Sequence, residues 1–144
     1  MQKLYWAITY FVIGYAIVLV TVTSLYQVPG PLKTSIGMIT ATFVFVDLCY
    51  RYFKKTNESG VCIRFKSVLG LMTLWALLSI GLDILLLVIL MPMISNGSLD
   101  WSFFNQQSPL YWVQFPLFYV FGFVAQAIYN RVVSLKDAQV NQLS

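Results

Sequence analysis

Four long apolar stretches dominate this sequence and restrict what it can fold into. They cover about residues 5–25, 34–53, 67–91 and 111–132. Each reaches the roughly 17–25 mainly apolar residues that an α-helix needs to cross a bilayer. The sequence therefore predicts an all-α, polytopic membrane protein, a single membrane domain over residues 1–144 built as an antiparallel bundle of four transmembrane helices.

Composition argues against a soluble domain. Apolar residues make up 59% of the chain and charged residues 10%, whereas soluble domains contain about 45–50% and about 25%. A chain of 144 residues cannot bury that excess in its own core, but lipid can cover it. Membrane lipids are therefore the first predicted partners.

The distribution of basic residues predicts an orientation. The net charge is +4, and of nine basic residues only Lys33 lies on the side of the membrane where the second stretch begins. The other eight are Lys3, Arg51, Lys54, Lys55, Arg64, Lys66, Arg131 and Lys136. Because basic residues accumulate in cytoplasmic loops, we expect both termini and the 54–66 loop to lie in the cytoplasm, with the protein in the inner membrane. The basic excess is then a topology signal, and no nucleic-acid partner is predicted.

The chain has no histidine, and this excludes several kinds of site. Bis-histidine haem ligation, histidine-based zinc or di-iron sites and Ser–His–Asp catalysis all require that residue. A glycine-rich phosphate-binding loop is also missing, and Cys49 and Cys62 lack the spacing of a metal site. The sequence predicts no catalytic residue, no metal and no cofactor, and thus a protein that is not an enzyme.

Asp83 interrupts the otherwise apolar run SIGLDILLLVIL, residues 79–90. A rise of about 1.5 Å per residue puts it roughly 12 Å below a helix end at Met91. A charge there costs about 2.5–3.5 kcal/mol, so we expect Asp83 to face the bundle or to be protonated. The predicted intramembrane polar site comprises Asp83, Ser79, Thr21, Thr42 and Tyr119. It is either a proton, cation or substrate site, or a hydrogen-bonded aspartate that holds helices together.

Asp47 lies four residues before Arg51, so the two side chains can pair on one face of a helix. The position is close to the predicted cytoplasmic boundary, where the arginine can extend to the headgroups. We interpret Asp47 and Arg51 as a structural ion pair, with an entry site for a cytoplasmic ligand as the alternative.

Small and amide residues at four-residue spacing predict helix contact faces. One face carries Gly122, Gln126 and Asn130, and another carries Gly37 and Ala41. Small residues let helices approach closely, and amides form hydrogen bonds between helices. We expect these faces to build the bundle or, alternatively, to bind a partner helix.

The connection between the third and fourth stretches is long and aromatic. It contains Trp101, Phe103 and Phe104 in the run LDWSFF. Amphipathic segments of this composition lie in the membrane interface. We expect these three residues to form an outer interface loop.

The order of these features resembles that of a family. The second stretch runs into YRYFKK, a short charged loop follows, and an aromatic fourth stretch reads YVFGFVAQAIYNR. This layout resembles small, uncharacterised four-helix inner-membrane proteins of bacteria. The resemblance implies the four-helix fold and no particular activity.

Two functions remain open. The first is a non-enzymatic inner-membrane protein that acts by helix–helix contacts, as an accessory or assembly subunit or as an immunity protein against a pore-forming toxin. The alternative is a small proton- or ion-coupled transporter or lipid-linked sugar flippase. In that case Asp83 would carry the coupling or substrate charge, and two copies of the chain would enclose the path. The predicted partners are accordingly a membrane protein or a second copy.

Overall fold

The structure is a computed structural model, and it describes residues 2–25, 27–57, 61–96, 99 and 109–143. The regular structure within these ranges is helical. The elements are α1 (Gln2–Ser24), α2 (Gly30–Thr56), α3 (Phe65–Asp83), the π-helix η1 (Ile84–Leu90), α4 (Met91–Asn96) and α6 (Pro109–Leu143). Four helical stretches, beginning at Gln2, Ser35, Phe65 and Trp112, are long and apolar enough to cross a membrane. The predicted all-α fold with four membrane-length helices is confirmed.

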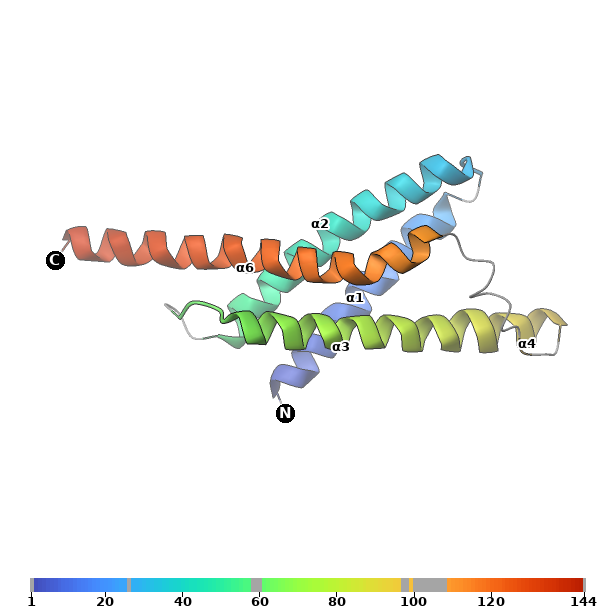
Figure 1. Ribbon diagram of the computed structural model, residues 1–144, viewed down its shortest axis with the longest axis horizontal. Helices are drawn as coiled ribbons and strands as arrows, with labels where there is room; N and C mark the ends of the chain where they lie inside the picture. Colours follow the sequence, from blue (N-terminus) through green and yellow to red (C-terminus); the bar gives the residue numbers. More distant parts are fainter. Residues whose placement is uncertain (1, 26, 58–60, 97–98, 100–108, 144) are drawn as a thin grey trace.

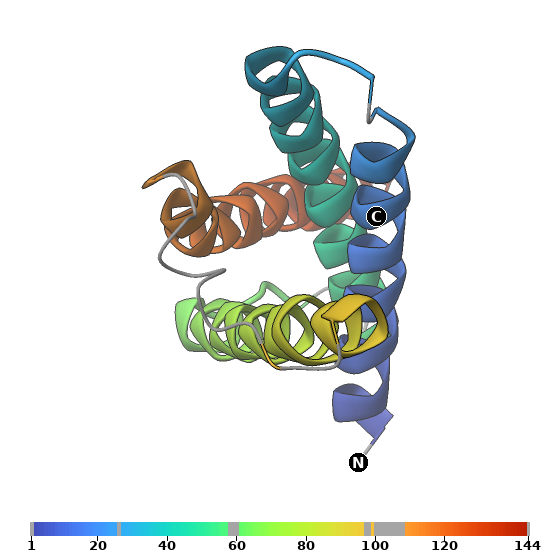
Figure 2. The same cartoon turned by 90° about the vertical axis from the view of Figure 1, so that its right-hand side faces the viewer.

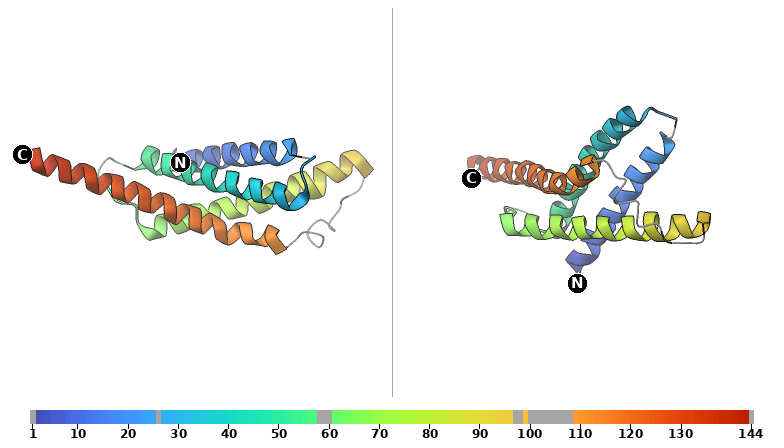
Figure 3. Two further views of the ribbon diagram at one scale, coloured as in Figure 1. Left: turned by 90° about the horizontal axis from the view of Figure 1, so that it is seen from above. Right: turned by 45° about the vertical axis from the view of Figure 1, so that its right-hand side comes forward.

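The long helices form two pairs that cross each other (Figure 1). In one layer α1 lies against α2, and in the other α3 lies against α6; seen end-on, the first pair runs across the second (Figure 2). The chain direction alternates, so that α1 and α3 run one way and α2 and α6 return (Figure 3). The helices therefore alternate as predicted, but the two pairs cross rather than align.

The ends of α2 follow from local sequence. Pro31 lies in its first turn, where a missing backbone N–H costs nothing. At the other end, both the backbone N–H and the side-chain amide of Asn57 donate to the carbonyl of Phe53, at 3.1 and 3.0 Å. Lys54 and Lys55 lie in the last turn, where cations interact favourably with the helix dipole.

The third stretch is one continuous rod made of α3, η1 and α4 (Figure 1). It extends to Asn96, which corrects the predicted end at residue 91. The winding changes directly after Asp83. Because a π-helix has a longer turn than an α-helix, Val88 can share the buried face of Asp83 although it lies five residues later.

The fourth stretch is longer than predicted at its C-terminal end. The helix α6 has 35 residues, from Pro109 to Leu143, and passes through Pro116. Pro116 therefore neither starts nor ends the helix, although it removes one backbone hydrogen bond. Its last turns extend beyond the other helices (Figure 1).

One aromatic ring from each long helix forms the centre of the core. Phe45 lies 6.1 Å from Phe11, 5.6 Å from Trp75 and 5.1 Å from Phe118, measured between ring centroids. All four rings are buried. Aromatic pairs at these distances add to the energy of burial, so this layer joins the two helix pairs.

Candidate functional site

Asp83 lies inside the bundle and is bonded to a tyrosine of another helix. Its exposed fraction is 6%, and its Oδ1 accepts a 2.7 Å hydrogen bond from the hydroxyl of Tyr15. Tyr15 is on α1 and half-buried. The carboxyl group thus has a donor that arrives from a different helix, as a buried acid requires.

A second contact sets the register between α1 and α3. The indole Nε1 of Trp75 donates to the backbone carbonyl of Ala7 at 3.0 Å. Ala7 and Trp75 are separated by 68 residues, and so are Tyr15 and Asp83. The helices α1 and α3 run in the same direction, so along their contact a residue of α1 lies beside the residue of α3 that is 68 positions later in the chain.

The side chains expected to bond to Asp83 form other hydrogen bonds in the structure. Thr21 donates to the carbonyl of Ile17 and Thr42 to that of Met38, both at 2.8 Å, which is the local bond that threonine forms within helices. Tyr119 shares a 3.0 Å hydrogen bond with Thr73 instead.

The position of Asp83 along the rod explains the difference. The prediction assumes that the helix ends at residue 91, but the rod continues to Asn96, so Asp83 lies farther from this end than predicted. The residue of α1 that lies level with Asp83 is therefore Tyr15, six residues before Thr21. Ser79, also expected at this site, is buried one turn before Asp83.

Asp47 and Arg51 form the ion pair that their spacing predicts. The Nε of Arg51 lies 2.7 Å from Oδ2 of Asp47. The side chains are 54% exposed for Asp47 and 62% exposed for Arg51. The pair is therefore on the outward face of α2, within the Ser35–Thr56 stretch.

The amide face of α6 binds the segment that precedes α3. Gln126 Nε2 donates to the carbonyl of Ile63 at 2.7 Å. The backbone N–H of Ile63 donates to Asn130 Oδ1 at 2.7 Å, and Asn130 Nδ2 also reaches the Ile63 carbonyl at 3.3 Å. Gly122 continues this face, and a Cβ added there would lie 2.6 Å from Met72. This face of α6 thus makes contacts within the chain, which is one of the two predicted alternatives.

The second small-residue face is also internal. Gly37 is buried, and a Cβ added to it would lie 3.1 Å from Val22 of α1. Ala41 is partly buried and packs against the core. Sequence reasoning missed Gly14, where an added Cβ would lie 2.8 Å from Leu48 and 2.9 Å from Phe45 of α2.

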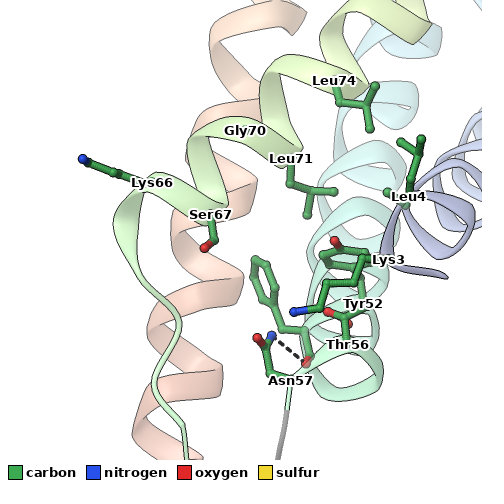
Figure 4. Close-up of a pocket in the computed structure, with 12 residues that line it drawn as sticks. Lys3, Leu4, Tyr52, Thr56, Asn57, Lys66, Ser67, Gly70, Leu71 and Leu74 are labelled. Atoms are coloured by element: carbon green, nitrogen blue, oxygen red, sulfur yellow. Dashed lines mark hydrogen bonds between the residues drawn. The ribbon is translucent and has the colours of Figure 1, made fainter. Parts of the chain in front are cut away.

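A cavity of about 350 Å³ opens where the start of α1, the end of α2 and the start of α3 meet (Figure 4). The Lys3 side chain extends into it, and Ser67 points toward it from the first turn of α3. The side chains of Leu4, Leu71 and Leu74 face one another at its other end. Sequence reasoning did not find this cavity, because its lining comes from three separate segments.

Trp101, Phe103 and Phe104, the expected outer interface loop, lie outside the described residues. Among the residues that are described, no three or more Cys, Asp or Glu side chains are grouped so that they could hold a metal.

Comparisons with known proteins add no assignment. The chain matches no protein-family model, no curated protein and no solved structure.

Proposed function

We propose that this chain is a non-enzymatic integral protein of the inner membrane that acts through helix–helix contacts, as an accessory or assembly subunit or as an immunity protein. The observation that carries the proposal is the exposed ion pair Asp47–Arg51 within a membrane-length stretch. Charged side chains in membrane helices almost always face protein or water rather than lipid. A helix of a partner membrane protein would cover this pair.

The residues around the pair extend the same surface. Ile39, Phe43, Asp47 and Arg51 follow each other at four-residue spacing, so they share one face of α2. Ile39 is 58% exposed and Phe43 is 73% exposed. A large exposed aromatic beside a charged pair is the composition of a specific contact surface. By contrast, exposed positions in the middle of α1, such as Val12 and Val20, are plain aliphatics.

Crosslinking tests this proposal. A photoreactive amino acid at position 43 should give a discrete protein adduct in native membranes, and the double variant Asp47→Leu/Arg51→Leu should abolish that adduct. The same amino acid at Val20, which is 62% exposed on α1, serves as the matched control and should label lipid. If both positions gave lipid adducts and no protein adduct, the proposal would be contradicted. An adduct with a second copy of the chain would favour the homodimer of the alternative function.

The proposed orientation has both termini in the cytoplasm. Its support is the positive-inside distribution, in which Lys33 alone lies at the opposite end from the other basic residues. Cys62 is exposed and lies within the 54–66 loop. A membrane-impermeant maleimide should therefore label Cys62 in inverted inner-membrane vesicles and not in spheroplasts, and the opposite pattern would reverse the topology.

The alternative function is a small proton- or ion-coupled transporter or lipid-linked sugar flippase centred on Asp83. Two observations favour it: the carboxyl group is buried and bonded across helices, and a π-helix begins at the next residue. Intramembrane acids and π-helical turns both occur frequently at functional sites.

Substitution of Asp83 separates the two functions. Asp83→Asn keeps the shape and a hydrogen-bond acceptor for Tyr15 but cannot release a proton or carry charge. A folded but inactive Asp83→Asn variant would support transport, while an Asp83→Leu variant that kept the cellular function would exclude it.

A further inference from the structure

We infer that the cavity between the starts of α1 and α3 and the end of α2 binds the headgroup and upper acyl chain of an anionic phospholipid. The cavity has a volume of about 350 Å³, which falls within the about 300–1,000 Å³ of small-molecule sites. The inference goes beyond the proposed function and rests on it in one respect, since it requires the chain to be inserted in a membrane.

The lining changes from polar to apolar along the cavity (Figure 4). The polar end is formed by Lys3, Thr56, Asn57 and Ser67. Leu4, Leu71 and Leu74 form the other end, between α1 and α3. The polar end lies at the helix termini, and the apolar end lies toward the bundle, so the gradient has the direction of a phospholipid in a leaflet.

Lys3 supplies the charge. Its ammonium group extends into the cavity toward Thr56 and Asn57, whereas the side chain of Lys66 points away (Figure 4). An ammonium group binds a phosphate as a compact point charge, and lysine near an anionic leaflet contributes attraction of its own. The ligand class is therefore a phospholipid whose headgroup has a net negative charge, such as phosphatidylglycerol, rather than a zwitterion such as phosphatidylcholine, in which an ammonium group balances the charge of the phosphate.

The apolar end distinguishes a lipid from free phosphate. A dissolved phosphate ion would use Lys3 and the polar rim and would leave the leucine-lined end without an occupant. An acyl chain can cover Leu71 and Leu74 by van der Waals contact, which a phosphate ion cannot do. The amphipathic shape thus favours the lipid as the source of the phosphate.

The residue Gly70 offers a way to block the cavity without damage to the fold. It lines the cavity, and a Cβ added to it meets no atom within 4 Å. Gly81 is also a glycine of α3 with open space around an added Cβ, but it does not line the cavity. Gly70→Leu should fill the site, and Gly81→Leu is its matched control. Lys3→Gln removes the charge, and Lys54→Gln removes an exposed charge at the same end that lies outside the cavity.

The experiment is native mass spectrometry of the detergent-solubilised full chain titrated with phosphatidylglycerol, with phosphatidylcholine and with inorganic phosphate. We expect one phosphatidylglycerol to remain bound to the natural sequence, to Gly81→Leu and to Lys54→Gln. Lys3→Gln should weaken this binding by about tenfold, the loss of one charge-assisted hydrogen bond, and Gly70→Leu should abolish it.

Other results would overturn the inference. Equal retention of phosphatidylcholine would exclude recognition of an anionic headgroup. Binding of inorganic phosphate as strong as that of the lipid would assign a simple anion site, and unchanged lipid binding by Gly70→Leu would place the lipid elsewhere. Flotation of the chain with phosphatidylcholine vesicles and its resistance to carbonate extraction test membrane insertion separately.

Discussion

The hydroxyl of Tyr15 donates a 2.7 Å hydrogen bond to Asp83, and this bond joins α1 to the point where α3 becomes a π-helix. The two residues are 68 positions apart, as are Ala7 and Trp75. Two bonds with the same offset, at points eight residues apart on each helix, fix both the rotation and the level of α1 against α3. The acid is therefore part of the geometry of the bundle whether or not it also has a transport function.

Tyr15→Phe should lower the stability of the bundle. The change removes a donor from a buried carboxyl group and keeps the aromatic ring, so the free energy of unfolding should fall by about 0.6–1.7 kcal/mol, the range of interhelical hydrogen bonds in membranes. Chemical unfolding in mixed micelles measures the change. Tyr119→Phe is the control, because its hydrogen bond to Thr73 is exposed; an equal loss in both variants would assign no special role to Tyr15.

Gly122→Ala should be destabilising, and Gly70→Ala should not. The added Cβ at position 122 would lie 2.6 Å from Met72 and 2.9 Å from Val68, both fully buried. Overpacking of this kind costs about 1–3 kcal/mol. At position 70 the methyl group meets open space, and the helix gains up to about 1 kcal/mol from the better helix former. Thermal unfolding of the two variants should therefore shift in opposite directions.

Asn130→Ala should release the segment before α3. The backbone N–H of Ile63 would lose its 2.7 Å acceptor, and the Ile63 carbonyl would keep only Gln126. Hydrogen exchange should then be faster at the Ile63 amide, while amides in the middle of α3 keep their protection. Ser134→Ala, which removes an exposed hydroxyl one turn later on the same helix, should leave exchange at Ile63 unchanged.

The two cysteines should differ in reactivity in the folded protein. Cys62 is exposed and Cys49 is 0% exposed, and a thiol reagent must reach sulfur to react. A maleimide should add once to the natural sequence in mild detergent and twice after denaturation. Rapid double labelling without denaturant would show that the core around α2 opens, since Cys49 packs there with other buried residues.

Features that depend on one segment could be predicted from the sequence. The four membrane-length helices follow from apolar length alone. The ion pair Asp47–Arg51 follows from four-residue spacing on one helix. The spacing of Gly122, Gln126 and Asn130 likewise identified a contact face, because residues four apart share one side of a helix.

Tertiary structure alone decided which helices those faces meet. The sequence indicated that Asp83 needs a partner, but not that Tyr15 is level with it, because the level depends on how α1 and α3 pack and on how far the rod continues past residue 91. The cavity beside Lys3 has the same origin, since three chain segments meet there. Local periodicity determines how each helix forms and which side it buries, whereas the register between helices is set by the fit of side chains that are distant in the chain, such as Phe11, Phe45, Trp75 and Phe118.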